Sequence, residues 1–554
     1  MKIEKKTYLN LIKENIGTVL FLFAMVALTI YAWRIGYIVW EDNDDALASF
    51  VTFGFFGKAY SGYTIYRNVV LGKIAAGIHT LFPQYNALVL SYFIGMLVGF
   101  TLLQRVFSEN LGIVFGTFMT SLIYLISFPT LYHGISFTKF AGLLGICGLV
   151  GLTDAIRKRG KFFRIIFGLI LVAFGCMLRI SAFALTVPFW ILILGRILYY
   201  DHSREMIKKT VMTVGSVALV VVLLAMTDRV ACGRGTWGEF TRYNSLRTEL
   251  LDYGMPPVYT NEEAYRELGW SETDWQMFRS WHYADTTWFS AEKLANTVAF
   301  KESYTKEHHT LRQYLVQFED NYVQNRRFVM TLLLLAVFFS FFETADLFMG
   351  GICALMLAEL AYYFYIGRWF ERVIFIPLIC TMVLTVYAMD AAAVKAASRR
   401  ARIAVSAVLL FYAVISCGIL TAEKTEADPG RKAQLEAFFI TLQNHPENLY
   451  VMDTSDDAWT ETFAPFEGST LGSVDNLVLD SGWLVPSPIF DKTAGYSGTP
   501  DVYRMLVEND NVYLVGDLFL DLKLRYVREH YGEEIEVVQA DDYWGIPIYR
   551  FVRP

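Results

Sequence analysis

Apolar residues gather in long runs over the first three quarters of the chain, and polar or charged residues separate the runs. A helix of about 20 apolar residues is long enough to cross the hydrocarbon core of a bilayer. The pattern predicts about eleven such spans. They lie at 16–38, 86–106, 112–129, 135–153, 163–178, 183–199, 210–227, 328–343, 347–366, 372–390 and 403–420. The first run is too long for a signal-peptide core, so we expect a retained membrane anchor.

Lysine and arginine cluster at four places along this pattern, and their distribution predicts the orientation. The clusters are Lys2, Lys5, Lys6 and Lys13; Arg157, Lys158, Arg159 and Lys161; Lys208 and Lys209; and Lys395, Arg399, Arg400 and Arg402. If the spans alternate, all four fall on one side, which the positive-inside rule identifies as the cytoplasm. The N-terminus is then cytoplasmic, and the large segments 39–85, 228–327 and 421–554 lie outside the cytoplasmic membrane.

The segment 421–554 differs from the rest of the chain and predicts a soluble domain. It holds 10 Lys and Arg against 24 Asp and Glu. Its periodicity predicts helices at 431–444 and 518–531 and strands at 449–452, 512–515, 535–539 and 546–552, while 459–497 has the composition of a loop. We therefore expect a polytopic helical membrane domain over 1–420 and an extracytoplasmic α/β domain over 421–554.

Composition excludes several classes of protein. The chain is 55% hydrophobic and 18% charged, whereas soluble domains have about a quarter charged residues. A formal net charge of -6 argues against a nucleic-acid partner. The chain has neither a Walker loop nor a G-x-G-x-x-G motif, so we expect no nucleotide cofactor. Five of the six cysteines lie in apolar runs, which predicts no disulfide on the outer face and is compatible with a bacterial protein.

Four carboxylates crowd the outer end of the first span, in the sequence Glu41-Asp42-Asn43-Asp44-Asp45. Like charges at a membrane surface repel, and at least one should have a raised pKa unless a cation shares the site. A solvated helix end is the simpler alternative. However, a segment rich in Gly, Tyr and Phe follows over 49–85, and a mere connection between two spans would not need it.

This layout resembles that of the GT-C glycosyltransferases, membrane enzymes that transfer a sugar from a polyprenyl-phosphate carrier. The resemblance is carried by the acidic cluster, the long first outer loop to Tyr85 and the soluble tail after Thr421. It implies helices lying along the membrane in that loop, a lipid-linked sugar donor and an envelope glycan, lipid or protein as acceptor. The W-W-D-Y-G signature of oligosaccharyltransferases is absent.

The acidic cluster suggests a chemical role for each of its members. A carboxylate at the interface can accept the proton of an acceptor hydroxyl, and we expect Asp44 or Asp45 to be that base. Glu41 and Asp42 would support the base or link to a metal, and a divalent cation stays open.

Cations predicted near the outer leaflet are candidates for binding the donor phosphate, because guanidinium groups match phosphate oxygens. They are Arg67, Lys73, His133, Lys139, Arg179, Arg368 and Arg372. Each could instead form an ion pair or extend to the lipid headgroups. Arg179 favours a function because it falls in a very short turn between two spans.

Five of the twelve Trp residues lie in the outer segment 228–327. Trp270, Trp275, Trp281 and Trp288 are candidates for acceptor binding, because aromatic rings stack on the apolar faces of sugars. An interfacial belt with a small core is the alternative.

Two other classes of protein remain open at this stage. A transporter or lipid flippase also has many spans, although its ionisable residues should lie in the middle of the membrane. An envelope assembly protein would use the tail as a binding module.

Overall fold

The computed structural model of the chain describes residues 2–56, 61–158, 162–303, 347–366, 368–389, 429–490 and 501–554 in continuous stretches. The spans expected at 328–343 and 403–420 lie outside these residues.

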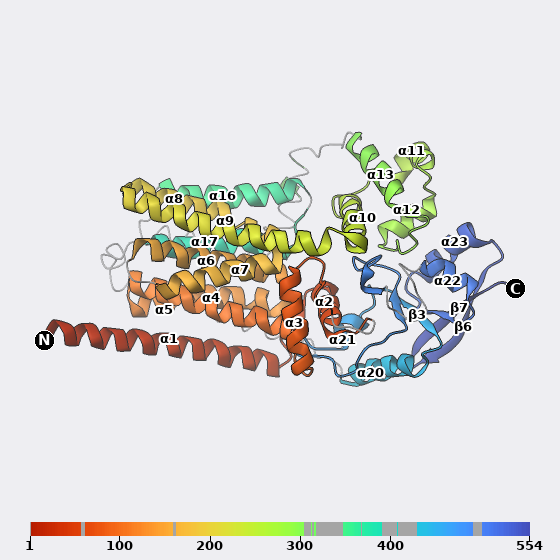
Figure 1. Ribbon diagram of the computed structural model, residues 1–554, viewed down its shortest axis with the longest axis horizontal. Helices are drawn as coiled ribbons and strands as arrows, with labels where there is room; N and C mark the ends of the chain where they lie inside the picture. Colours follow the sequence, from red (N-terminus) through yellow and green to blue (C-terminus); the bar gives the residue numbers. More distant parts are fainter. Residues whose placement is uncertain are drawn as a thin grey trace.

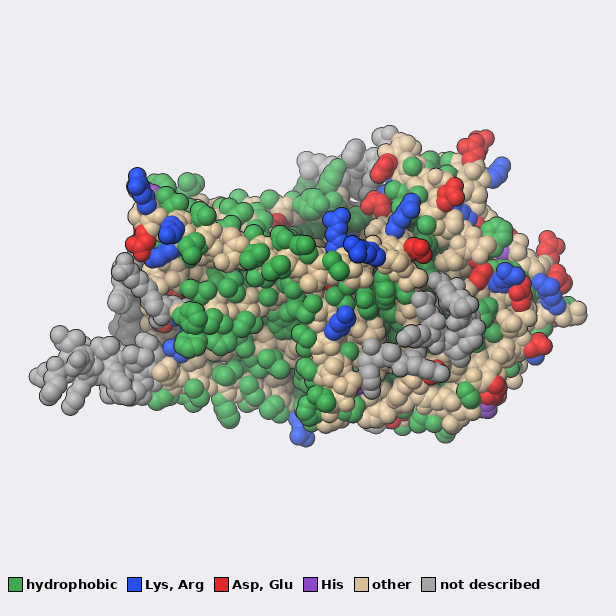
Figure 2. Space-filling view, in the orientation of Figure 1, with side chains coloured by type: hydrophobic (Ala, Val, Ile, Leu, Met, Phe, Trp, Pro, Cys, Tyr) green, Lys and Arg blue, Asp and Glu red, His purple; other side chains and the backbone are tan. Residues whose placement is uncertain are grey.

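Eight helices in the described part of the chain are long and apolar enough to cross a membrane, which confirms a polytopic helical membrane protein. They are α1 (Lys2–Arg34), α4 (Ala87–Leu111), α5 (Ile113–Tyr132), α6 (Phe137–Arg157), α7 (Phe162–Ala184), α9 (Arg204–Cys232), α16 (Leu347–Tyr365) and α17 (Glu371–Ala388). Figure 1 shows them running side by side along the longest axis of the molecule. Figure 2 shows hydrophobic side chains covering this half of the surface, as contact with lipid requires.

The most buried of these helices is α6, which lies at the centre of the bundle. Its glycines recur every third residue, at Gly142, Gly145, Gly148 and Gly151. A Cβ atom on Gly148 would lie 2.7 Å from the carbonyl oxygen of Gly168 in α7. The glycines therefore let α7 pack against α6 at backbone distance, as small residues do at helix interfaces in membranes.

The chain reverses direction at Arg179, inside the segment assigned to α7. Arg179 has an extended backbone (φ -164°, ψ 107°) within otherwise helical residues. Before Arg179 the chain runs antiparallel to α6, because Gly168 lies against Gly148 and the later Gly175 lies against the earlier Gly145. After Arg179 it runs back along α6, because Phe183 contacts Gly145 and the later Trp190 donates to Thr153. The short helix α8 (Val187–Tyr200) continues this return. The turn expected between the spans at 163–178 and 183–199 is thus present.

One end of the bundle carries all the large connections, and we call it the domain end. There β1 (Val39–Trp40) pairs with β2 (His133–Ile135), and α2 (Asn43–Phe53) follows directly. Gly54 ends α2 in the left-handed region at φ 72°, which glycine adopts without strain. The next helix, α3 (Val69–Leu81), lies across the ends of the bundle helices in Figure 1.

Short helices make up the described part of the large outer segment that follows α9. They are α10 (Gly235–Leu251), η1 (Val258–Thr260), α11 (Glu262–Glu267), α12 (Glu272–Arg279) and α13 (Ala291–Ser303). We refer to residues 235–303 as the helical segment.

The C-terminal residues form an α/β domain around a five-stranded sheet with the order β4-β3-β5-β7-β6. Its elements are α20 (Pro429–Asn444), β3 (Leu449–Met452), α21 (Ala458–Glu461), β4 (Leu477–Leu479), η3 (Pro488–Phe490), α22 (Val502–Glu508), β5 (Val512–Val515), α23 (Leu520–Tyr531), β6 (Glu536–Tyr543) and β7 (Ile546–Val552). Strands β4, β3 and β5 are parallel, and β7 is antiparallel to its neighbours.

The prediction of a loop over 459–497 is wrong where β4 forms. This strand has three residues, all buried, so it shows no alternation of polar and apolar positions. A strand this short is recognised by its pairing with β3, which periodicity cannot reveal.

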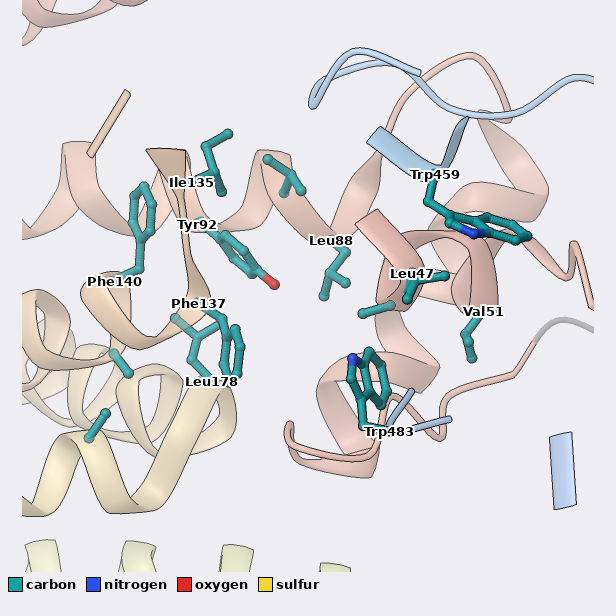
Figure 3. Close-up of a cluster of buried hydrophobic side chains, with 14 of the residues drawn as sticks. Leu47, Val51, Leu88, Tyr92, Ile135, Phe137, Phe140, Leu178, Trp459 and Trp483 are labelled. Atoms are coloured by element: carbon teal, nitrogen blue, oxygen red, sulfur yellow. The ribbon is translucent and has the colours of Figure 1, made fainter. Parts of the chain in front are cut away.

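A continuous hydrophobic core joins the membrane domain to the C-terminal domain. Phe50 of α2 packs at 5.4 Å against the ring of Trp459, and Phe55 packs at 5.0 Å against Phe439. Figure 3 shows Leu47 and Val51 of α2 beside Trp459 and Trp483 of the C-terminal domain. The first outer loop is therefore the hydrophobic link between the two parts, and it fixes the position of the acidic cluster.

Candidate functional site

A cavity of about 370 Å³ lies at the domain end, where several parts of the molecule meet. The first outer loop contributes Asp42 and Asp44, and the reversal in α7 contributes Arg179. The connection between α16 and α17 contributes Arg368 and Arg372. The remaining walls come from the helical segment and the C-terminal domain. Three guanidinium groups and two of the predicted carboxylates thus face one hollow.

Asp44 is the member of the acidic cluster with access to this cavity and an unusual acidity. It lies in the first turn of α2, and its side chain is 20% exposed. Burial, and then the negative charge of Asp42, raises the pKa of Asp44 to about 7. A carboxylate with that pKa can take up a proton near neutral pH and release it again.

Asp42 holds one of the guanidinium groups close to Asp44. Its side chain caps α2 by accepting a 3.0 Å hydrogen bond from the backbone N–H of Asp44. Its other carboxylate oxygen pairs with Arg372, whose Nη1 lies 3.7 Å from Asp44 Oδ2. Arg372 therefore lies beside both Asp42 and Asp44 and supplies the positive charge that two crowded carboxylates require.

Asp45 points away from the cavity, and its hydrogen-bonding capacity is used. It pairs with Arg67, accepts from the Tyr92 hydroxyl at 3.0 Å and accepts from the backbone N–H of Phe137 at 3.1 Å. Both members of the ion pair are almost completely buried. Arg67 also donates from Nε to Tyr92 at 2.9 Å. This arrangement ties α2 to α4 and α6, so Asp45 and Arg67 serve to position their neighbours.

Arg179 has no carboxylate partner among the described residues. Its Nη1 donates to the Thr138 hydroxyl at 2.8 Å and its Nε to the Ser181 hydroxyl at 3.2 Å. The guanidinium carbon lies 5.2 Å from the ring centroid of Phe137. These neutral neighbours fix its orientation, and no direct ion pair compensates its charge among the described residues, as is expected of an anion-binding group.

Arg368 is held at the cavity by a second acid. Its Nη2 pairs at 3.1 Å with Asp252, which also accepts from Arg247 at 3.0 Å. The Nε of Arg368 is buried without an acceptor in the described part of the chain. The fully buried Arg247 additionally donates to the Tyr66 hydroxyl at 2.8 Å. Asp252 and Arg247 thus connect the helical segment to the cavity.

Glu41, Lys139 and His133 lie near one another and outside the cavity. Lys139 Nζ is buried and lies 3.6 Å from Glu41, and it donates to the carbonyls of Thr130 and Gly134 at 3.1 and 2.9 Å. Burial raises the pKa of Glu41. His133 stacks on Tyr37 with 5.1 Å between centroids. None of these three side chains lines the cavity.

The remaining predicted residues are spread over the domain end. Lys73 is exposed on α3, with its ammonium 5.9 Å from the Tyr63 ring. Of the four predicted tryptophans, Trp281 lines the cavity. Trp270 is buried and lines a second cavity of about 600 Å³. Trp275 is partly buried, and the ring centroid of Trp288 lies 4.1 Å from that of His530. The acceptor role expected of all four stays a prediction.

Several residues of the cavity carried no signal in the sequence. Tyr66, Asp252, Thr454, Ser455 and Trp483 all line it. They come from three segments that are far apart along the chain, and none belongs to a motif. The sequence offered one signal for Asp252, an acid directly before the turn residues Tyr253 and Gly254 at the end of α10.

A group of side chains with the spacing of metal ligands lies just behind the cavity wall. It consists of the buried His282, Asp453 and Asp480, whose ligand atoms lie within 4.8 Å of one another. The ammonium of Lys523 lies 3.3 Å from Asp453 and 2.8 Å from Asp480. A cation of the protein itself therefore already balances these two carboxylates. The metal link expected of Glu41 and Asp42 stays a prediction.

Comparisons with known proteins give a distant similarity in fold. No family model and no curated protein matches the chain. Two crystal structures of ArnT from Cupriavidus metallidurans, one bound to undecaprenyl phosphate and one in the apo state, are similar to it at 11% identity and a TM-score of 0.44. They cover 96% and 95% of this chain and 97% of their own. A TM-score of 0.44 is too low to carry an argument about function.

Proposed function

We propose that the chain is a glycosyltransferase that moves a sugar from a polyprenyl-phosphate carrier to an envelope acceptor outside the cytoplasmic membrane. One observation carries the proposal: the carboxylate of Asp44 and the uncompensated guanidinium of Arg179 line the same cavity at the end of a membrane bundle. The first group suits a general base and the second suits the phosphate of a lipid-linked donor.

The reaction divides between these groups as follows. Asp44 accepts the proton of an acceptor hydroxyl, and the hydroxyl oxygen forms a bond to the anomeric carbon of the sugar. The bond between that carbon and the phosphate oxygen breaks, and its electron pair stays on the phosphate. Arg179, Arg368 and Arg372 stabilise the negative charge that develops there. No step requires an oxidant, a reductant or a nucleotide.

The placement of charge favours group transfer over transport. Ionisable residues that are buried within the described bundle gather near its ends: Asp154 and Arg164 at one end, Asp45 and Lys139 at the other. Glu359, within α16, departs from this pattern. A conduit should have ionisable residues in the middle of the membrane. The cavity instead opens among the domains outside the spans, where a soluble acceptor can reach it.

A transfer assay tests the proposal directly. Purified protein in lipid nanodiscs is given a panel of polyprenyl-phosphate sugars together with envelope extract as acceptor, and released polyprenyl phosphate is measured. We expect release by the wild type and a loss of about 100-fold or more for Asp44→Asn, since a general base contributes about 10²–10⁴. Asp510→Asn is the matched control, because that side chain is 97% exposed on the C-terminal domain.

Two results would contradict the proposal. One is a wild-type protein that is folded and binds no polyprenyl phosphate. The other is an Asp44→Asn variant that releases polyprenyl phosphate at the wild-type rate.

A further inference from the structure

The side of the cavity formed by the C-terminal domain is built from the carboxyl ends of two parallel strands. Thr454 and Ser455 follow β3, and Gly482 and Trp483 follow β4. In open α/β sheets, ligands bind outside the carboxyl ends of the strands. We refer to these four residues as the strand-end wall.

A buried charge network holds the two loops of this wall in place. Lys523 of α23 bonds to Asp453 and Asp480, the residues that directly follow β3 and β4. Ser481 donates to Asp453 at 2.7 Å and accepts from the backbone N–H of Thr454 at 2.8 Å. His282 donates from Nε2 to Asp453 at 2.6 Å. The network thus ties the wall to the helical segment as well.

Glycine at position 482 is required by the close approach of these loops. Its φ is 82°, and a Cβ atom there would lie 2.3 Å from the Thr454 hydroxyl oxygen. Its N–H donates to the carbonyl of Trp281 at 3.0 Å, and Trp281 itself has a positive φ of 68°. A residue other than glycine is strained in this region, and such residues cluster at functional sites.

The wall presents an indole donor without a protein acceptor. The Nε1–H of Trp483 is buried and has no hydrogen-bond partner among the described residues. The indole ring itself packs at 5.3 Å from Tyr66. A buried donor left unpaired costs free energy unless a ligand supplies the acceptor. Aromatic faces, an indole N–H and the hydroxyls of Thr454 and Ser455 suit the hydroxyl groups and apolar face of a sugar ring.

The two sides of the cavity differ in chemistry in a way that matches the two parts of a lipid-linked donor. Arg179, Arg368 and Arg372 come from the ends of membrane helices, next to the bilayer that would hold the prenyl chain. The strand-end wall comes from the soluble domain. A phosphate bound by the arginines therefore directs the attached sugar away from the membrane and towards this wall.

We infer that the strand-end wall is the subsite for the sugar of the donor, with Trp483 as a specificity-determining residue that donates to a sugar oxygen. The inference rests on the proposed function, since it requires a lipid-linked sugar in the cavity. The Lys523 network positions the wall and does not touch the sugar.

Binding measurements with two kinds of probe test the inference. Undecaprenyl phosphate and a panel of polyprenyl-phosphate hexoses (glucose, galactose and mannose) are titrated into the nanodisc-embedded protein. Trp483→Phe keeps the aromatic ring and removes the N–H. We expect it to weaken binding of the preferred hexose probe by about threefold to tenfold, the worth of one hydrogen bond, and to leave binding of undecaprenyl phosphate unchanged.

The chain offers a matched control. Trp275 also has a buried Nε1–H without a partner among the described residues, and it lies outside the cavity. Trp275→Phe should change neither affinity, whereas Arg179→Met should weaken both probes.

Each outcome bears on one of the two proposals. A Trp483→Phe variant that binds the hexose probes as the wild type does, or that loses both probes equally, overturns the sugar subsite while leaving the proposed function standing. A hexose panel that binds no differently from undecaprenyl phosphate in the wild type overturns it too. A wild type that binds neither probe overturns the proposed function and the subsite with it.

Discussion

Asp44 and Asp45 are adjacent in sequence and have opposite environments. Asp45 is buried, and its carboxylate is fully engaged by Arg67, Tyr92 and the backbone of Phe137. Asp44 lines the cavity with Arg372 at 3.7 Å. Because α2 rotates successive side chains by about 100°, one acid faces the protein interior and the next faces the cavity. In the proposed reaction, Asp44 is therefore the proton acceptor, and Asp45 fixes the helix that presents it.

The pKa of Asp44 predicts how activity depends on pH. Burial and the charge of Asp42 raise this pKa to about 7, and a base works only in its deprotonated form. We expect kcat/KM for sugar transfer to be constant above about pH 7 and to fall about tenfold per pH unit below it.

Asp42→Asn sharpens this prediction. Asparagine still caps α2, so the helix should keep its N-terminus. Removing the negative charge of Asp42 takes away a cause of the raised pKa and removes one of the carboxylates that share the charge of Arg372 with Asp44. The inflection of the pH profile should then move to lower pH. If the inflection of the Asp42→Asn profile stays at the wild-type pH, another group is the base.

At the level of secondary structure, the site depends on where helices and strands end. Arg179 occupies the point at which α7 reverses, and Asp44 lies in the first turn of α2. The strand-end wall follows β3 and β4. Chain ends of this kind expose side chains and backbone groups that the interior of a helix or strand would hide.

The Lys523 network gives a prediction about stability. Burial favours the neutral form of Asp453, but the hydrogen bond from His282 and the charge of Lys523 outweigh it and hold the pKa of Asp453 below its usual value. Lys523→Met leaves two buried carboxylates without their cation, which costs about 3–5 kcal/mol. We expect a clear drop in the melting temperature of the detergent-solubilised protein, measured by tryptophan fluorescence.

Two further variants separate charge from packing in this experiment. Adding Asp453→Asn and Asp480→Asn to Lys523→Met removes the unpaired charges and should recover much of the loss. Arg504→Met removes an exposed partner of Glu508 in α22 and should have little effect. A Lys523→Met protein that melts at the wild-type temperature would show that the network does not hold the wall.

At the scale of the whole molecule, the membrane domain and the C-terminal domain behave as one packed unit. Phe50, Phe55 and Trp459 share a hydrophobic core, and Trp40 donates from Nε1 to the carbonyl of Phe463 at 3.1 Å. Asn43, within the acidic cluster, donates to the carbonyl of Thr454 at 2.5 Å. The position of the base is thus coupled directly to the strand-end wall.

The proposed orientation predicts which surface is accessible in intact cells. With Cys232 replaced by serine, a cysteine introduced by Asp510→Cys should react with a membrane-impermeant thiol reagent, because that side chain is 97% exposed on the C-terminal domain. Lys208→Cys, at the opposite end of the bundle, should react only after the membrane is permeabilised. The reverse pattern would place the cavity in the cytoplasm.

The sequence by itself determined the features that depend on local pattern. Runs such as 86–106 and 135–153 predicted α4 and α6, because a helix that crosses a bilayer must be apolar over about 20 residues. The strands at 449–452 and 512–515 have the predicted bounds, and the crowded charges of Glu41 to Asp45 include two carboxylates, Asp42 and Asp44, that line the cavity. Even the turn at Arg179 followed from a charge between two apolar runs.

Only the tertiary structure decided which of the candidate residues meet. Arg67 and Arg179 were both candidates for binding phosphate, yet Arg67 forms a buried ion pair with Asp45, whereas Arg179 donates to the neutral side chains of Thr138 and Ser181. Trp483 gave no signal because its place in the cavity wall depends on β4, a strand that exists through its pairing with β3. The pattern of polar and apolar residues along a chain indicates whether each residue faces water, lipid or the protein interior. A binding site depends instead on distances between residues far apart in sequence, and tertiary packing sets those distances.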